Sequence, residues 1–134
     1  MFEKKCIEKD DVHIIKNGIE IEKFKFNNKI RDEYREKFDL SVSRAVANLS
    51  TLSEYCLPYI RVGGIFVSYK SSTVDEEIEQ AKNAVKILGG KIENNIKFQI
   101  PESEIGRSFI KIQKNKITPK KYPRKAGLPS KEPL

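Results

Sequence analysis

Basic residues gather at one end of this sequence, where their chemistry suits contact with phosphate groups. From residue 114 to residue 134 the chain has seven basic residues and one acid, so this segment carries nearly all of the net charge of +7. It also holds four of the six prolines. Such a segment cannot bury enough apolar surface to fold alone, and each phosphate that it neutralises releases counterions. We predict an extended basic arm that contacts RNA and adds little to the core; a solvated tail without a role is the alternative.

Acid, base and metal chemistry has few candidates. The run of acids from Asp75 to Glu77 opens a predicted helix, where the positive end of the helix dipole favours carboxylates, so the dipole accounts for these residues without catalysis. Cys6, Cys56 and His13 stand far apart, and they cannot assemble a zinc site. We therefore predict no catalytic side chain, no metal and reduced thiols, as is usual in the cytoplasm.

Two amphipathic segments are predicted to be helices that position the remaining residues. Apolar residues recur at helical spacing over 74–88, where Thr73 and a glutamate three residues later form a capping-box pattern and Gly89 ends the helix. A shorter helix is predicted over 52–60, with Thr51 in the same capping role.

Strands are predicted between and after these helices. Segments 38–46 and 65–69 are short and largely apolar, as buried parallel strands are. Segments 91–100 and 107–113 alternate at period two around a short link, which predicts an antiparallel hairpin. The order strand, helix, strand, helix, strand, strand predicts an α/β fold with a parallel sheet and crossover helices. The first thirty residues show only weak patterns, with strand-like runs at 12–15 and 19–26 and a charged helix near 30–37.

Composition sets outer limits on the class of protein. A chain of 134 residues, 38% hydrophobic and 34% charged, makes one domain with a modest core. Its pI near 9.4 favours a polyanionic partner, most often nucleic acid; a lysine-rich soluble protein is the alternative. No run approaches the roughly 20 apolar residues of a membrane span, and no signal peptide is visible. We therefore predict a cytoplasmic protein without membrane contact.

Several motifs resemble one known family. The run from Tyr34 to Leu49, with Ser43-Arg-Ala-Val-Ala47 at its centre, is similar to a strand-to-helix signature of the bacterial 16S ribosomal RNA guanine-N7 methyltransferases, the glucose-inhibited division protein B family. Further similar segments are Gly63–Lys70, Gly106–Lys114 and, most specifically, Thr118–Gly127. The resemblance covers the C-terminal part of that family only.

This resemblance implies a fold, a reaction and a partner. The fold would be the C-terminal half of a Rossmann-like class I methyltransferase domain over 34–113, after a poorly matched segment 1–33 and before a basic, proline-rich tail over 114–134. The reaction would transfer a methyl group from S-adenosylmethionine to N7 of guanine 527 in 16S ribosomal RNA. Because N7 already carries an in-plane lone pair, this chemistry needs positioning rather than a general base.

Site residues follow from the resemblance and from the rule that ligands bind beyond the carboxyl ends of parallel strands. Arg44 is expected to contact S-adenosylmethionine, with a surface arginine as the alternative. Lys70 and Arg107 are expected to bind RNA; the alternatives are a solvated lysine and a structural salt bridge. The tail residues expected to bind RNA are Lys120, Lys121, Arg124 and Lys125.

The sequence also departs from the family. No two glycines have G-x-G spacing, so the glycine-rich turn that approaches the cofactor is missing, as is the acid that holds its ribose. The family's Arg-Ala-Glu motif has no match near Phe24–Phe26. These departures predict a truncated chain that is inactive and binds no S-adenosylmethionine by itself, with an open sheet edge. A non-enzymatic RNA-binding module and a vestigial fragment are the alternatives.

Overall fold

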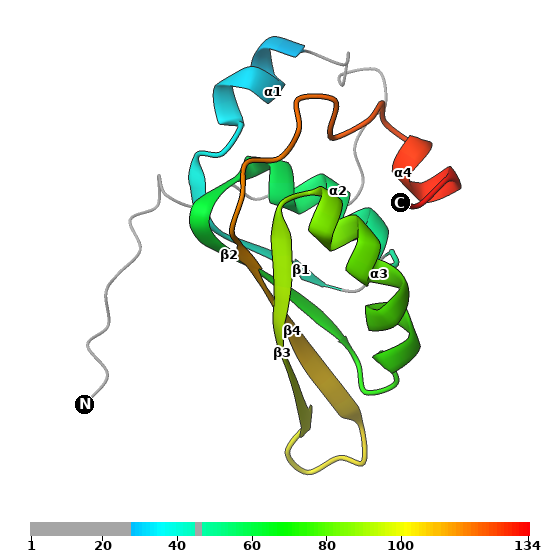
Figure 1. Cartoon of the computed structure of the whole chain (residues 1–134). Coiled ribbons are helices and arrows are strands. Elements are labelled where there is room, and N and C mark those ends of the chain that lie inside the picture. The colour runs from blue at the N-terminus through cyan, green and yellow to red at the C-terminus, as the bar shows by residue number, and fades with distance from the viewer. Residues whose placement is uncertain (1–27, 45–46) are drawn as a thin grey trace, which may run out of the picture.

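A single sheet with helices on one side organises the molecule (Figure 1). The structure, a computed structural model, describes residues 28–44 and 47–134. Its elements are the helix α1 (Asn28–Tyr34), the strand β1 (Phe38–Arg44), the helix α2 (Leu49–Cys56), the 3-10 helix η3 (Leu57–Tyr59), the strand β2 (Ile60–Ser71), the helix α3 (Asp75–Ile87), the strands β3 (Gly90–Gln99) and β4 (Gly106–Lys114), and the short helix α4 (Leu128–Lys131).

The sheet confirms the predicted mixed α/β fold. Its four strands lie in the order β1-β2-β4-β3, with β1 parallel to β2 and with β3 and β4 forming the predicted antiparallel hairpin. The β2 strand is longer than the predicted 65–69, because Gly63 and Gly64 lie inside it rather than in a turn before it. Gly63 has a φ of +90°, which an L residue rarely adopts, and the pairing with β1 is irregular at this level.

Helices α2 and α3 cover one face of the sheet. Side chains at alternate positions of β2, such as Phe66 and Ser68, are fully buried on this face, as period-two geometry requires. They pack with Ile110 and Ile112 of β4 and with apolar residues of both helices, such as Val85. This contiguous cluster is the hydrophobic core.

No described helix covers the opposite face. Large apolar side chains of three strands remain exposed there, namely Leu40 and Val42 of β1, Ile96 of β3 and Phe109 of β4. The β1 strand is also the outer strand on its side of the sheet within the described residues, and the open edge that the sequence predicts stays a prediction.

The predicted caps differ from those observed. The α2 helix starts three residues earlier than predicted because Asn48, not Thr51, is the N-cap, and its Oδ1 accepts a 2.8 Å hydrogen bond from the Thr51 amide. The α3 helix starts at Asp75 without a side-chain cap. Gly89 does end α3, with a φ of +87°, and a Cβ there would lie 2.2 Å from the Lys116 carbonyl oxygen.

The C-terminal segment 115–134, which we call the strap, corrects the prediction of an extended arm that adds little to the core. Figure 1 shows it crossing beside α1 and over α2 before it ends at α4. Tyr122 is only 6% exposed and belongs to the core cluster, and Thr118 is buried. The prediction failed because charge and proline content alone do not show that isolated side chains of a segment can fill sites on an existing body.

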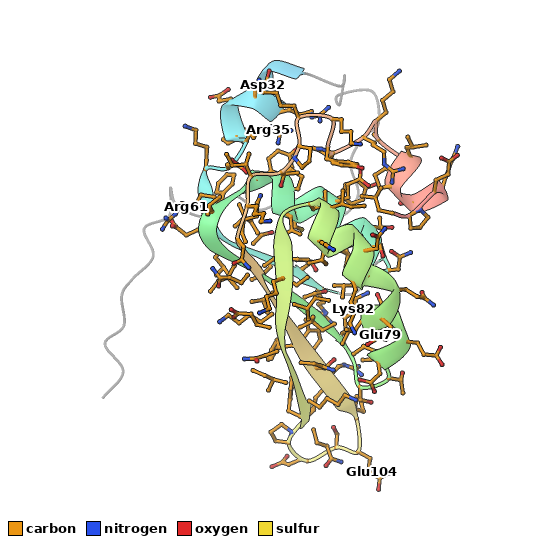
Figure 2. All side chains as sticks on the ribbon, viewed as in Figure 1. Asp32, Arg35, Arg61, Glu79, Lys82 and Glu104 are labelled. Atoms are coloured by element: carbon orange, nitrogen blue, oxygen red, sulfur yellow. The ribbon has the colours of Figure 1, made fainter. Side chains whose placement is uncertain are left out.

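Polar contacts fix the strap to three elements. The Glu54 carboxylate of α2, itself 1% exposed, accepts bonds from Arg124 Nε and Nη2 at 3.0 and 2.8 Å. The Thr51 hydroxyl donates to the Pro129 carbonyl oxygen at 2.9 Å. From α1 and the loop after it, Arg31 and Arg35 donate to strap carbonyl oxygens, and Figure 2 shows Arg35 beside the strap.

Some predictions fall on residues that the structure does not describe. These are the strand-like runs at 12–15 and 19–26, the end of the predicted strand at Val46, and the side chains of Cys6 and His13. The charged helix predicted near 30–37 corresponds to α1, which begins at Asn28 and ends at Tyr34.

Candidate functional site

The carboxyl ends of β1 and β2 form a rim where the sequence predicts Arg44 and Lys70, and where the fold also brings Arg107. Arg44 ends β1 and is paired in register with Tyr69 of β2. Ser71, the last residue of β2, is paired with Arg107 of β4. Since Lys70 lies between these two pairs, the fold brings Arg44, Lys70 and Arg107 to one end of the sheet, as expected for a ligand site in a parallel sheet.

An open cavity of about 550 Å³ lies at this rim and is lined by Val42, Ser43, Arg44 and Tyr69. Arg44 is exposed, and no carboxylate of the described residues forms an ion pair with it. The Ser43 hydroxyl donates to the Ser68 hydroxyl at 3.2 Å. The cavity therefore offers a guanidinium without an ion-pair partner in the described part of the chain and an aromatic ring, which suit an anionic group and a planar or apolar group.

Three aromatic side chains extend from this cavity across the uncovered face. The Phe109 ring lies 4.9 Å from Phe98 and 5.4 Å from Tyr69, measured between ring centroids. The sequence pattern does not predict this cluster, because the three residues belong to three different strands. Only the register of the sheet brings them together, although each occupies an alternate position of a predicted strand.

Lys70 is placed at the rim as expected, but its ammonium group has internal partners. The side chain is only 6% exposed, and Nζ donates to the Glu77 carboxylate at 2.6 Å and also to the Ala47 carbonyl oxygen. Glu77 Oε1 further accepts a bond from the Leu49 amide at 2.5 Å. Lys70 and Glu77 thus fasten the chain between β1 and α2 to the start of α3, which gives one of the three acids a structural role.

Arg107 is half-buried at the start of β4. Its Nη1 donates to the Gly106 carbonyl oxygen at 3.0 Å, and no carboxylate of the described segments lies within ion-pair distance. The expected alternative of a structural salt bridge therefore has no support in the described part of the chain, and the guanidinium retains free donors at the rim.

The strap cations divide into two groups. Arg124 turns inward to Glu54, whose hydrogen bonds raise the pKa of this guanidinium and keep it charged. Lys120, Lys121 and Lys125 are exposed. The Lys121 ammonium lies 5.2 Å from the centroid of the Tyr122 ring, a cation–π distance.

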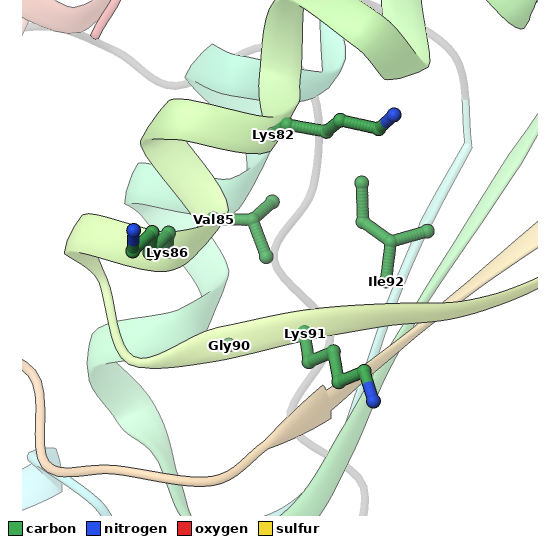
Figure 3. Close-up of a pocket in the computed structure, with 6 residues that line it drawn as sticks. All are labelled: Lys82, Val85, Lys86, Gly90, Lys91 and Ile92. Atoms are coloured by element: carbon green, nitrogen blue, oxygen red, sulfur yellow. The ribbon is translucent and has the colours of Figure 1, made fainter.

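A second, smaller groove of about 270 Å³ lies between α3 and β3. Figure 3 shows its lysines diverging: Lys82 extends across the groove toward Ile92, while Lys91 points to the other side of β3. Lys82 is also paired with Glu79 at 2.5 Å. Divergent surface lysines of this kind do not form a defined anion site.

Neither a metal-binding cluster nor a membrane-spanning helix occurs within residues 28–44 and 47–134. No group of three or more potential metal-binding side chains occurs in these segments. None of the described helices is long and apolar enough to cross a membrane.

Comparison with known proteins identifies the class to which this fold and rim belong. The profile of a methyltransferase family, GidB (rRNA small subunit methyltransferase G), matches residues 4–106. The match begins well before Tyr34 and ends ahead of the strap. The four-stranded sheet and its helices are consistent with the Rossmann-like fold of methyltransferases.

Curated relatives agree with the family match. A protein of Clostridium tetani named ribosomal RNA small subunit methyltransferase G is 53% identical over 104 residues, which cover 78% of this chain and 44% of the relative. Proteins of the same name from Acetivibrio thermocellus and Limosilactobacillus reuteri are 55% and 52% identical, each over 42% of its own length. The chain belongs to the rRNA small subunit methyltransferase G family, and it spans less than half the length of these relatives.

Proposed function

We propose that this chain supplies the C-terminal part of an S-adenosylmethionine-dependent methyltransferase that acts in the cytoplasm on N7 of guanine 527 in 16S ribosomal RNA. The observation that carries the proposal is the rim cavity beside Arg44, in a chain about half identical to proteins named ribosomal RNA small subunit methyltransferase G. The N7 lone pair is already directed at an incoming methyl group, so the protein must align two reactants rather than move a proton.

The described residues fit one part of the cofactor. Arg44 can donate hydrogen bonds to a carboxylate, and Tyr69 offers a ring face beside it. A glycine-rich turn and a ribose-binding acid are not among the four residues that line the cavity. S-adenosylmethionine, when bound, supplies the electrophilic methyl group, and we assign Arg44 to holding its carboxylate end. We expect the isolated chain to show no appreciable affinity for it in calorimetry; micromolar binding would contradict this expectation.

RNA contacts are proposed at two places. Arg107 at the rim keeps free donors for a phosphate near the target base, while Lys120, Lys121 and Lys125 are exposed on the strap. Lys70 and Arg124 are assigned structural roles instead, because Glu77 and Glu54 neutralise them. A charged group already paired with a carboxylate gains little from a phosphate.

A chimera tests the proposed activity. This chain would replace the matching segment of the Clostridium tetani relative, in a bacterial strain that lacks the methyltransferase, and N7 methylation of guanine 527 would be mapped in 16S ribosomal RNA. We expect methylation with the chimera and none with the chain alone. Arg44→Ala in the chimera should lower kcat/KM about tenfold, the equivalent of roughly 1.4 kcal/mol.

Two outcomes of the chimera experiment would contradict the proposal. A folded chimera that binds RNA but does not methylate it would exclude the enzymatic role and favour the RNA-binding module, which the exposed strap lysines support. Unchanged activity of Arg44→Ala would exclude Arg44 from cofactor binding.

A further inference from the structure

Side chains of the strap point in two directions, some toward the body of the protein and others toward solvent. Thr118, Tyr122 and Pro123 are buried against the body, while Lys120 and Lys121, which lie between them, are exposed. Because the residues on both sides of the two lysines are packed against the body, the lysine side chains between them point outward. The lysines therefore stand on the outer side of a segment whose inner side is packed.

The strap backbone is held where these lysines attach. Arg35 donates from Nη1 to the Thr118 carbonyl oxygen at 3.2 Å and from Nη2 to those of Lys120, at 3.3 Å, and Tyr122. Arg31 Nη2 donates to the Pro123 carbonyl oxygen at 2.5 Å. Two arginines thus bind backbone carbonyl groups of the strap and hold the segment that carries the lysines.

The outward lysines have no carboxylate partner among the described residues. Glu132 is the only acid of the strap, and its carbonyl oxygen accepts a bond from Arg124. Glu36 and Glu54, two carboxylates that contact the strap, accept hydrogen bonds from the Thr118 amide and from Arg124. Within residues 28–44 and 47–134, the surface therefore presents positive charge without a carboxylate counterion.

The first part of the strap is remote from the rim. Arg107 is the second residue of β4 and Lys114 is the last, so at about 3.3 Å per residue the first strap residue, Asn115, lies about 26 Å from Arg107. Figure 1 shows the strap and the hairpin tip at opposite ends of the molecule. One phosphate cannot contact both places.

We infer that the strap is a preformed docking surface for the phosphate backbone of single-stranded RNA. It would bind a part of the substrate RNA that lies at a distance from the rim, while the rim receives the target base. The inference rests on the proposed function for the identity of the RNA. Because the anchoring contacts already order the strap in the folded protein, RNA binding does not have to order it. Association with RNA therefore costs less conformational entropy.

Removal of the outward charges is the first test. The probe is a labelled single-stranded RNA with the 16S sequence around guanine 527, and the full chain carries Lys120→Gln, Lys121→Gln and Lys125→Gln. At about 0.7 per phosphate contact, the slope of log K against log salt should become less negative by about 2. The control combines Lys82→Gln, Lys86→Gln and Lys91→Gln, which remove the same charge elsewhere. An equal change in both variants would overturn the inference, because binding would then follow net charge alone.

Loosening the anchor is the second test. Glu54→Gln removes the carboxylate that holds Arg124 and raises the net charge by one, so a mobile cationic tail would bind RNA equally well or better. A preformed surface should instead lose affinity, by about threefold or more. Glu79→Gln, on the exposed side of α3 (Figure 2), makes the same charge change away from the strap and should not weaken binding. Tighter RNA binding by Glu54→Gln would overturn the inference. If the Glu54→Gln variant does not fold, the lysine variants test the inference instead.

Separation from the rim is the third test, and it distinguishes this inference from the proposed function. Arg107→Gln and the strap lysine variant should lose affinity by factors that multiply when they are combined, as expected for independent sites. Loss at Arg107 with no loss at the strap would overturn the strap inference and leave the proposed function intact. Loss at the strap alone would support the inference and count against the rim contact.

Discussion

The two faces of the sheet are built from the same strands but have opposite surroundings. On β4, Lys114 points to the helix-covered face and is fully buried, whereas Lys111 points to the other face and forms a partly exposed pair with Glu93. Phe66 of β2 and Phe109 of β4 differ in the same way. Residue type therefore does not determine the contribution of a side chain in this chain; the parity of its position on the strand does.

The largest effect expected from this comparison concerns the two phenylalanines. Phe66→Ala should lower the free energy of unfolding by about 4 kcal/mol, because it leaves a cavity under α2 and α3. Phe109→Ala removes a ring that is 38% exposed and should cost about 1 kcal/mol, mainly through lost contact with Phe98 and Tyr69. Urea unfolding measures both values. Equal costs would show that the face without described helices is covered in solution.

The two lysines give the next largest effect. Lys114 Nζ donates to the carbonyl oxygens of Leu57 and Ile60 at 2.5 and 3.1 Å and to the Thr118 hydroxyl at 2.7 Å, and it lies 3.2 Å from Glu36. Lys114→Met should cost about 3 kcal/mol, since these acceptors lose their donor inside the protein.

Lys111→Met is the matched control on the other face of the same strand. Its pair with Glu93 is partly exposed and should contribute less than about 1 kcal/mol. A cost at Lys111 as large as that at Lys114 would contradict the contrast between the faces.

Cysteine chemistry gives the smallest expected effect on stability. Burial raises the pKa of the Cys56 thiol from 9.0 to about 11, and a hydrogen bond with Ser41 opposes this only in part. Because the raised pKa favours the protonated thiol in the folded state, its stabilisation is complete below pH 9 and is lost as the pH rises toward about 11.

Thiol reactivity measures this shift in a Cys6→Ser background. At pH 8 the thiolate of Cys56 should be about a hundredfold scarcer than that of an ordinary thiol. Val42→Cys, at a site that is 70% exposed on the other face, supplies the comparison in a Cys56→Ser protein. Similar rates for the two thiols would show that Cys56 is not shielded.

The sequence predicts the elements well where the pattern of apolar residues is long. The period of 74–88 and the alternation of 91–100 and 107–113 correspond to α3, β3 and β4 within a few residues. Capping was less predictable. Thr51 and Glu54 resemble a capping box, but both bind residues of the strap instead, and local sequence holds no information about such distant partners.

The candidate site was predictable only in outline. The rule for the carboxyl ends of parallel strands predicts Arg44 and Lys70 at one rim, where the register places them, whereas Arg107 joins them only through the antiparallel pairing of β4 with β2. The roles of Lys70 and Arg124 as RNA ligands stay predictions without structural support, because each has a carboxylate partner that spacing does not reveal. The burial of Tyr122 also depends on a surface formed by other elements.

The long reach of the strap anchors affects how the chain acquires its structure during synthesis. Glu54 and Arg124 are 70 positions apart, and Arg31 and Pro123 are 92 apart. Contacts of such high sequence separation form late, because a large loop must close first. On a translating ribosome, the sheet and both covering helices emerge before the strap. Until the strap emerges, the Glu54 carboxylate lacks its partner Arg124. The strap residues, which are made after the sheet and both helices, therefore complete this part of the fold, and a ribosome that stops before Arg124 would release a protein in which the Glu54 carboxylate lacks this partner.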